Sequence, residues 1–304
     1  MPISIGHEES FNPNDHRSVL ERYLSSALGY PIQFVHAELL TMSSRKAPWR
    51  LDVVGLDGMI RKYVLRLDAR FAEHEYAVLR AMDSLPIPTP RVYGWDPEGQ
   101  TLGVPCFFSD FIEGQSLRYA TLAGEAWAED LFIDTVCTLQ DISREQLARI
   151  GDHLTEEQTA EGFLEGAYDY FKKEAHPLAE AVYTKLKASA PEFPPSRFSN
   201  GDLWLDNMIV QDQKLVAVID FQHAGFSDPI YEFLLPFFVA PELRDRGIEV
   251  RYCRKMGYDP DVLPWYRALE YFDTWHWVRS TGKAFVHHTN ETLQEALEDW
   301  IHRS

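Results

Sequence analysis

The sequence predicts an α+β protein, with a small antiparallel sheet near the N-terminus and a mainly helical C-terminal part. Three strand-like runs lie close together at 32–40, 49–56 and 60–67, and Asp57-Gly58 between the last two is a strong hairpin signal. Beyond residue 115, apolar residues recur mostly at helical spacing. At 304 residues, the chain has the length of one large or two small domains.

Helical periodicity predicts the individual helices. They are expected at 14–28, 72–82, 127–142 and 165–190, with further helices in 260–303. Gly29-Tyr30-Pro31 should stop the first of them, and the pattern at 165–190 contains Pro177.

Two short apolar runs, 208–210 and 215–219, flank a polar turn at 211–214. Strand-like runs on either side of a polar turn are typical of a β-hairpin. The segment therefore predicts a hairpin inside the otherwise helical part.

Composition is that of a soluble globular protein, with 45% hydrophobic and 25% charged residues. The apolar run Phe233–Ala240 contains Pro236 and is too short to span a bilayer. The N-terminal segment does not have the pattern of a signal peptide, because His7, Glu8 and Glu9 interrupt it early. Three cysteines show no metal-type spacing and cannot all pair. Reduced thiols and a cytoplasmic location are the expectation.

The formal net charge of -18 argues against nucleic acid or an anionic membrane as a partner. It is compatible with a cationic small substrate. The alternative is that the acidity only keeps the protein soluble.

The most informative stretch is 199–210, in which four residues separate Asp202 from Asn207. Asp220 then closes an apolar run a short way on. This is the layout of a kinase catalytic loop, Asp-x-x-x-x-Asn, followed by a metal-binding Asp at the end of a strand. An isolated Asp-x4-Asn is more often a polar loop, so the prediction depends on Asp220 and on the features below.

The chemistry of phosphoryl transfer explains this spacing, because the protein contributes mainly by positioning the reactants and stabilising the charge on the phosphates. Asp202 is the candidate base that meets the acceptor hydroxyl. Amide and carboxylate oxygens suit Mg²⁺, which makes Asn207 and Asp220 the predicted metal ligands. A hairpin between them would set Asn207 before one strand and Asp220 after the other, so that both face one ion.

A resemblance to a known family rests on a few short motifs. They are Gly201-Asp202-Leu203 with Asn207, Ile219-Asp220-Phe221, and Gly225-Phe226-Ser227-Asp228-Pro229. Together they resemble the aminoglycoside phosphotransferase and choline kinase family. The resemblance implies a protein-kinase-like, two-lobed fold and phosphorylation of a small molecule. The chain departs from the family at Asn200, where His is usual. Its Gly-Asp-Leu-Trp motif also occurs in fructosamine kinases, so the subfamily stays open.

The resemblance also implies residues that bind the nucleotide. Arg66, in a Val-Leu-Arg run, takes the place of the cation that binds the α/β-phosphates, and Lys62 on the same strand face is the competing candidate. Glu75 is expected to pair with that cation from the following helix, whereas Glu73 would point elsewhere.

The implied hinge between the lobes lies in 105–114. Adenine would accept a hydrogen bond from the Ile112 N–H and donate one to the Asp110 carbonyl. The loop over the phosphates, 41–48, has no glycine that would let backbone approach phosphate closely. A side chain from 43–46 would contact phosphate there, or the loop is a solvated basic turn.

The implied acceptor pocket lies in the C-terminal part, where Glu270 and Asp273 stand among tryptophan, tyrosine and phenylalanine residues. Carboxylates and aromatic faces attract ammonium groups, so these two acids are candidates for binding a cationic acceptor. The alternative is ordinary core packing of the large residues. Glu232 stands where the family usually has Asp, and its expected role is to pin the loop that carries Asp220.

The predicted lobes are 1–112 for nucleotide binding and 113–304 for catalysis and substrate binding. The predicted function is an O-phosphotransferase that uses ATP or GTP and Mg²⁺ on a small-molecule hydroxyl. One alternative is another acceptor, such as choline, homoserine, fructosamine or a sugar. The other is a nucleotide-binding module without catalysis, suggested by Asn200 and the glycine-poor loop. The sequence leaves the acceptor, the nucleotide base and the oligomeric state open.

Overall fold

The computed structural model describes residues 11–40, 48–67, 71–148, 150, 154 and 157–302. The chain forms two compact units that alternate along the sequence. Unit 1 comprises 1–116, 144–153 and 208–224, and unit 2 comprises 117–143, 154–207 and 225–304. The assignment of one lobe to nucleotide binding and the other to catalysis stays a prediction.

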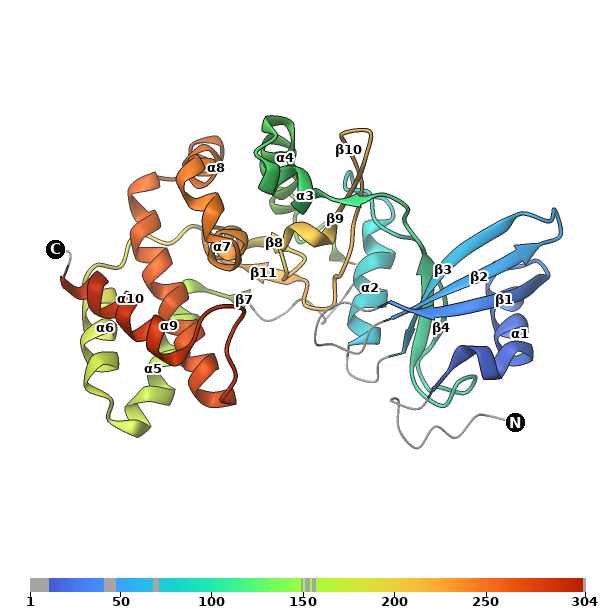
Figure 1. Cartoon of the computed structure of the whole chain (residues 1–304), viewed down its shortest axis with the longest axis horizontal. Helices are drawn as coiled ribbons and strands as arrows, with labels where there is room; N and C mark the ends of the chain where they lie inside the picture. The colour runs from blue at the N-terminus through green and yellow to red at the C-terminus, as the bar shows by residue number, and fades with distance from the viewer. Residues whose placement is uncertain are drawn as a thin grey trace. The chain divides into compact units, whose positions relative to one another are not determined.

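Unit 1 is built on a five-stranded sheet in the order β1-β2-β3-β5-β4, in which every neighbouring pair is antiparallel (Figure 1). The strands are β1 (Ile32–Leu39), β2 (Trp49–Gly55), β3 (Ile60–Leu67), β4 (Val92–Asp96) and β5 (Cys106–Asp110). The predicted turn at Asp57-Gly58 joins β2 to β3. Gly58 has a φ of 73°, which favours glycine, and its N–H donates to the Gly55 carbonyl at 3.0 Å.

Helix α1 (Arg17–Leu28) follows a 3-10 turn (Pro13–His16) and supplies Leu20 and Leu24 to the core of the sheet. The predicted helix began at 14, so its first turn is 3-10 rather than α. The helix ends as predicted at Gly29, whose φ is 79° and whose N–H donates to the Ser25 carbonyl at 3.0 Å.

Side chains of α1 cover the outer edge of β1. The Ser25 hydroxyl accepts from the Ile32 N–H at 3.0 Å, and the Glu21 carboxylate accepts from the Phe34 N–H at 3.0 Å. The Arg17 guanidinium donates to the Phe34 carbonyl at 2.9 Å. These contacts satisfy backbone groups that an edge strand would otherwise offer to another chain.

Unit 1 also contains helix α2 (Ala72–Met82), as predicted, and a second sheet in the order β10-β9-β6. Its strands are β6 (Gln115–Ser116), β9 (Met208–Gln211) and β10 (Lys214–Val218). The predicted hairpin is present, with a turn of two residues instead of four. Asp212 and Gln213 both adopt positive φ, 50° and 60°, which is the type I′ geometry that suits the twist of a hairpin.

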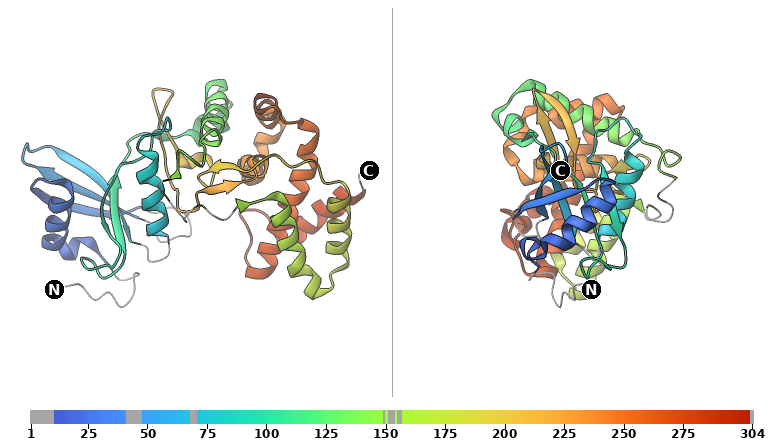
Figure 2. Two further views of the ribbon diagram at one scale, coloured as in Figure 1. Left: turned by 180° about the vertical axis from the view of Figure 1, so that it is seen from behind. Right: turned by 90° about the vertical axis from the view of Figure 1, so that its right-hand side faces the viewer.

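Unit 2 is mainly helical. Its helices are α3 (Leu117–Ala123), α4 (Ala126–Gln140), α5 (Ala160–Glu174), α6 (Pro177–Ala188), α7 (Pro229–Val239), α8 (Ile248–Met256), α9 (Leu263–Thr281) and α10 (Asn290–His302), with 3-10 turns η4 (Leu205–Asn207), η5 (Pro241–Arg246) and η6 (Pro260–Val262). Helices α5, α6, α9 and α10 pack side by side (Figures 1 and 2). A small sheet in the order β7-β11-β8 joins β7 (Glu157–Gln158), β11 (Gly225–Ser227) and β8 (Arg197–Ser199).

The helical pattern predicted at 165–190 is two helices. α5 ends at Ala175, which adopts a left-handed φ of 50°, and Pro177 begins α6. Proline has no N–H and restricts the residue before it, so a helix cannot run through it unbroken, but it fits the first turn of a new helix.

Aromatic packing forms the core of unit 2. Phe171 of α5 lies 4.1 Å from Trp275 of α9, and Phe233 of α7 stacks on Tyr252 of α8 at 3.7 Å, measured between ring centroids. All three cysteines are free and buried. Among the described helices, none is long and apolar enough to cross a membrane.

Candidate active site

The loop after β8 places Asp202 and Asn207 in contact. Gly201 takes a φ of 74°, which turns the chain sharply before Asp202. The turn η4 then brings Asn207 back, and its Nδ2 donates to the Asp202 carbonyl at 2.9 Å and to Asp202 Oδ2 at 3.0 Å. The four-residue spacing thus closes a loop in which an amide holds the carboxylate of Asp202.

The other end of the Asn207 amide has a different environment. Asn207 is 4% exposed, and its Oδ1 accepts no hydrogen bond from the described residues. An amide oxygen is a hard donor of the kind that Mg²⁺ takes. The orientation of Asn207 therefore fits a side chain that positions Asp202 with its nitrogen and offers its oxygen to a cation.

Asn200, which stands where the family usually has His, braces the same loop. It is 1% exposed. Its Nδ2 donates to the Asp202 carbonyl at 3.0 Å, and its Oδ1 accepts from the Asp202 N–H at 3.4 Å. A side-chain amide has a donor and an acceptor, so it can bond both backbone groups of one residue.

Glu232 of α7 anchors the strand that enters this loop. Its Oε2 accepts from the Ser199 hydroxyl at 3.0 Å, and the same hydroxyl accepts from the Gly201 N–H at 3.0 Å. Burial raises the pKa of Glu232 above its ordinary value, while hydrogen bonds from Ser199 and Ser227 oppose this. The contact with Ser199 ties Glu232 to the Asp202 loop, and its role in pinning the loop that carries Asp220 stays a prediction.

Asp228 supports α7 at its first turn. Its Oδ1 accepts from the N–H groups of Ile230 and Tyr231, both at 3.0 Å, and its Oδ2 accepts from the Tyr266 hydroxyl at 2.8 Å. The Asp-Pro pair at 228–229 is therefore a helix cap followed by a proline at the first helical position.

In unit 1, Arg66 of β3 and Glu75 of α2 form an ion pair, with Arg66 Nη2 3.1 Å from Glu75 Oε1. The Arg66 side chain is 23% exposed and Glu75 is 4% exposed. The competing cation, Lys62, pairs instead with Glu113, which is exposed, and Glu73 is exposed as well. The expected contact is present, and the role of Arg66 toward phosphate stays a prediction.

Asp220 follows β10 in a left-handed conformation, with a φ of 61°. Asp is among the few residues that tolerate this region, which is enriched at functional sites. Phe221 next to it is fully buried, and the Phe221 carbonyl accepts from the Ala224 N–H at 3.1 Å. A buried anchor and a closed turn thus fix the backbone that carries Asp220.

The predicted hinge, 105–114, comprises β5 and the residues on either side of it. The Asp110 carboxylate accepts from the Tyr93 hydroxyl at 3.1 Å, and burial raises the pKa of Asp110. The N–H groups of Asp110 and Phe111 donate to carbonyls of neighbouring chain segments, while the Ile112 N–H donates to no group in the described part of the chain. This leaves Ile112 available for the predicted contact with adenine.

The two predicted acceptor residues of α9 differ in accessibility. Glu270 is 6% exposed, and burial raises its pKa well above the ordinary value. The Asp273 side chain is 29% exposed and accepts from the Tyr231 hydroxyl at 2.9 Å, with His276 Nδ1 at 3.7 Å. Asp273 is therefore the better placed of the two to meet a ligand, and the burial of Glu270 favours the packing alternative for that residue.

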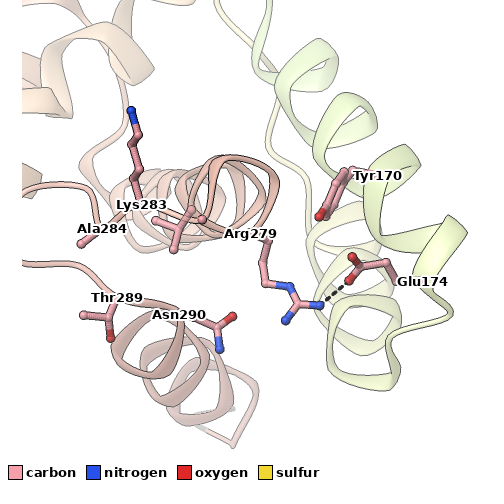
Figure 3. Close-up of a pocket in the computed structure, with 9 residues that line it drawn as sticks. Tyr170, Glu174, Arg279, Lys283, Ala284, Thr289 and Asn290 are labelled. Carbon is pink, nitrogen blue, oxygen red and sulfur yellow. Dashed lines mark hydrogen bonds and ion pairs between the residues drawn. The ribbon is translucent and has the colours of Figure 1, made fainter.

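A hollow of about 490 Å³ lies at the C-terminal ends of α5 and α9, in unit 2 (Figure 3). It is lined by Tyr170, Glu174, Val278, Arg279, Gly282, Lys283, Ala284, Thr289 and Asn290. Arg279 points to Glu174 and pairs with it at 2.7 Å (Figure 3). None of the predicted site residues lines this hollow.

Sequence reasoning missed several contacts of the site. Arg118 of α3 lies 3.5 Å from Asp206 and over the ring of Trp204, whose Nε1 donates to Asp206 at 2.8 Å. The contact of His74 Nε2 with the Ala224 carbonyl, at 2.8 Å, was missed as well. The phosphate loop predicted at 41–48 lies outside the described residues except for Pro48.

Comparison with known structures defines the class of fold. The chain superposes with a TM-score of 0.69 on a protein from Ralstonia eutropha assigned as an aminoglycoside phosphotransferase, at 16% identity over 93% of this chain and 95% of the other. A thermostable mutant of the aminoglycoside phosphotransferase APH(4)-Ia, in complex with AMP-PNP and hygromycin B, gives 0.63 at 16% identity over 93% and 98%. APH(2")-IIia, in complex with GDP and kanamycin, gives 0.63 at 14% identity over 94% and 98%. These likenesses confirm the α+β, protein-kinase-like fold.

The family follows from the sequence itself. The phosphotransferase enzyme family (APH) matches residues 53–269, which is most of the chain. This chain belongs to that family.

One curated relative is a much longer protein. Acyl-CoA dehydrogenase family member 10 of Mus musculus is 21% identical over an alignment 301 positions long, which covers 84% of this chain. The chain spans only 27% of that relative's length.

Proposed function

We propose that this protein is a small-molecule kinase that transfers the γ-phosphate of ATP or GTP to a hydroxyl group in the presence of Mg²⁺. The observation that carries the proposal is the 3.0 Å contact between Asn207 Nδ2 and Asp202 Oδ2, in a chain of the phosphotransferase family. Solved proteins of the same fold bind AMP-PNP with hygromycin B, or GDP with kanamycin, which supports a nucleotide and a small acceptor as the ligands.

Asp202 acts as the base. Its carboxylate accepts the proton of the acceptor hydroxyl while the hydroxyl oxygen bonds to the γ-phosphorus. The bond from phosphorus to the bridging oxygen breaks, and the nucleoside diphosphate leaves. Asn207 and Asn200 hold Asp202 in place through both its backbone and its carboxylate, and such positioning is the main contribution a protein makes to phosphoryl transfer.

Asn207 and Asp220 are the proposed metal ligands, since both carry oxygen donors and Asn207 Oδ1 accepts no hydrogen bond from the described residues. Support comes from the hairpin of β9 and β10, in which Met208 pairs with Val218. Asn207 directly precedes this pair and Asp220 follows it by two residues, so both flank the same end of the hairpin. Bound Mg²⁺ would neutralise charge on the phosphates. Arg66, held by Glu75, is the proposed partner of the α/β-phosphates.

For the acceptor, we propose an amine-bearing alcohol. The net charge of -18 and the partly exposed Asp273 carboxylate support a positively charged group. The Asp273 carboxylate accepts from the Tyr231 hydroxyl, and the Tyr231 ring stacks on Phe163, so aromatic faces lie near this carboxylate. Choline, homoserine, fructosamine and sugars are acceptors to compare.

The decisive experiment combines an acceptor panel with one substitution. Purified protein is given ATP or GTP with Mg²⁺, and amine-bearing and neutral alcohols are tested side by side for phosphate transfer. Asp202→Asn should lower turnover about 10²–10⁴-fold and leave binding of the nucleotide with Mg²⁺ nearly intact, since it removes only the base. Asp212→Asn, in the exposed hairpin turn, is the matched control.

Three outcomes would contradict parts of the proposal. Equal turnover by the wild type and Asp202→Asn removes Asp202 from catalysis. Tight nucleotide binding without transfer to any acceptor of a broad panel favours the binding module. Transfer confined to neutral or anionic alcohols refutes the amine-bearing acceptor.

A further inference from the structure

The segment that carries Asp220 is held at both ends by α2 and the loop that follows α2. Before Asp220, the Val218 N–H donates to the Pro88 carbonyl at 2.9 Å. After it, the Ala224 carbonyl lies 2.8 Å from His74 Nε2. Since a carbonyl oxygen can only accept, Nε2 of His74 carries the proton of this hydrogen bond.

A second contact on the same side of α2 supports the first. The ring of Phe71, which precedes α2, meets the ring of His223 edge to face at 5.0 Å between centroids. Phe71 and His74 therefore hold two neighbouring residues, His223 and Ala224, three and four positions after Asp220.

The next residue of α2 has a different task. Consecutive helical residues project about 100° apart, so His74 and Glu75 reach different partners from one rigid helix. Glu75 pairs with Arg66 at 3.1 Å, while His74 bonds the segment after Asp220. One helix thus holds both the proposed phosphate cation and the backbone around a proposed metal ligand.

We propose that His74 is a positioning residue for metal-dependent nucleotide binding, which acts by fixing segment 218–224 through its hydrogen bond to the Ala224 carbonyl. The proposal rests on the proposed role of Asp220 as a metal ligand. Asp220 has a left-handed φ of 61°, a conformation that persists only where the surrounding structure determines it. Loss of the His74 bond frees the segment to relax and moves the carboxylate of Asp220.

The first test needs no acceptor. Isothermal calorimetry measures the Kd of the non-hydrolysable analogue AMP-PNP with saturating Mg²⁺ and again in EDTA, for wild type, His74→Ala and His74→Gln. We expect His74→Ala to weaken binding about three- to tenfold with Mg²⁺ only, as for a typical single hydrogen bond. His74→Gln, whose amide can donate from a similar reach as Nε2, should restore the wild-type value.

The second test uses the nucleotide-free protein. Hydrogen–deuterium exchange of the amides of Val218 and Ala224 should be faster in His74→Ala than in wild type or His74→Gln. Glu73→Ala, at an exposed position of the same helix, is the matched control and should change neither readout. Should His74→Ala fail to fold, His74→Asn, whose amide reaches only the position of Nδ1, is compared with His74→Gln in its place.

Asp220→Ala separates failure of this inference from failure of the proposed metal site. If Asp220→Ala keeps the Mg²⁺-dependent gain in affinity, the metal role of Asp220 is wrong, and the exchange rates alone decide whether His74 fixes the segment. If Asp220→Ala loses that gain while His74→Ala binds and exchanges as the wild type does, His74 is not a positioning residue. Faster exchange with unchanged Mg²⁺-dependent affinity also overturns the proposal.

Discussion

At the residue scale, the two ends of one amide explain why Asn stands at 207. The nitrogen of Asn207 donates to Asp202 at 3.0 Å, and its oxygen accepts no hydrogen bond from the described residues. Neither Ala nor Asp can serve both purposes. Ala loses both contacts, and Asp offers an oxygen where Asp202 needs a donor.

Asn207→Asp is therefore predicted to be more damaging than its size suggests. It would place two carboxylates about 3 Å apart, and like charges at this separation raise the proton affinity of the pair. We expect turnover to fall at least about tenfold at neutral pH, because the base is held protonated or displaced. Steady-state kinetics across pH measures it, with Asn207→Ala beside it. Wild-type turnover in Asn207→Asp would show that Asp202 does not depend on the Asn207 nitrogen.

Asn200 gives a second prediction at this scale. Asn200 is 1% exposed, and Asn200→Ala removes the side-chain oxygen that accepts from the Asp202 N–H, while the Asp202 carbonyl keeps its hydrogen bond from Asn207. Unsatisfied buried groups cost about 1–3 kcal/mol each, so the unfolding free energy should fall by about that amount and turnover should fall with it. Chemical denaturation and kinetics measure the two effects. A variant as stable and as active as the wild type would show that Asn200 is a neutral replacement for His.

Sequence could predict the close contacts of the site and not the distant ones. Asp202 and Asn207 are five positions apart, so their spacing alone limits where they can meet. Arg66 and Glu75 could be paired only through the family's known arrangement. The bond from His74 to Ala224 joins residues 150 positions apart, and nothing in the local pattern around either one indicates it.

At the element scale, the turn between α9 and α10 carries local strain. Phe285 and His288 exchange two backbone hydrogen bonds, at 3.0 and 2.8 Å, across a two-residue turn. Val286 in that turn has a φ of 54°, which is a genuine outlier for a β-branched residue. Gly282, at the end of α9, has a φ of 68° and open space where a Cβ would stand.

Two substitutions in this turn should have opposite signs. Val286→Gly removes backbone strain of about 1–3 kcal/mol from the folded state. Glycine loses more conformational entropy on folding, which costs about 1 kcal/mol, so the variant should be neutral or stabilised by up to about 2 kcal/mol. Gly282→Ala should destabilise by about 1 kcal/mol through its φ alone, since nothing lies within 4 Å of the new Cβ. Thermal unfolding of both variants measures the difference. A clear loss of stability in Val286→Gly would mean that the valine side chain is needed there.

Elements with strong local signals could be predicted well, and their ends less so. Asp57-Gly58 allowed the hairpin between β2 and β3 to be predicted, because few residues tolerate the positive φ that its turn requires. The hairpin at 208–218 was predicted with too long a turn, because Asp212 and Gln213 adopt positive φ without a glycine to indicate it. The pattern at 165–190 joined two helices, because α5 and α6 have similar apolar spacing on either side of Pro177.

At the scale of the whole molecule, the division into units could not be read from local pattern. Residues 208–224 belong to the same unit as 1–116, although 91 residues separate the two along the chain. Contacts such as the bond from the Val218 N–H to the Pro88 carbonyl join them. The predicted lobes 1–112 and 113–304 stay a prediction, and the first segment of unit 1 ends nearby, at residue 116.

Stability against pH is also a property of the whole chain, and two sets of buried groups oppose each other. Burial raises the pKa values of Asp228, Glu232, Glu249 and Glu270. For each of these acids the folded state keeps its proton to higher pH than the unfolded chain does. The unfolding free energy therefore falls as pH rises from about 4, the ordinary value, through the raised pKa.

His288 acts in the other direction. It is 6% exposed, stacks on Phe238 at 4.0 Å between centroids, and its Nε2 lies 3.1 Å from the Phe238 carbonyl. Burial lowers the pKa of His288 from 6.5 to about 4. Between these two values the unfolded chain binds the proton and the folded state does not, so the contribution of His288 is complete above pH 6.5 and is lost as pH falls toward 4.

A substitution that cannot titrate isolates this contribution from that of the acids. His288→Phe keeps an aromatic ring against Phe238 and removes the proton equilibrium, so between pH 6.5 and 4 its unfolding free energy should fall less than that of the wild type, by about 1–3 kcal/mol. Its stability at neutral pH should be lower, because the hydrogen bond to the Phe238 carbonyl is gone. Urea denaturation at a series of pH values measures both, with His36→Gln at an exposed position of β1 as the control. If the wild type and His288→Phe lose stability in parallel as the pH falls, then His288 is protonated as readily in the folded protein as in the unfolded chain.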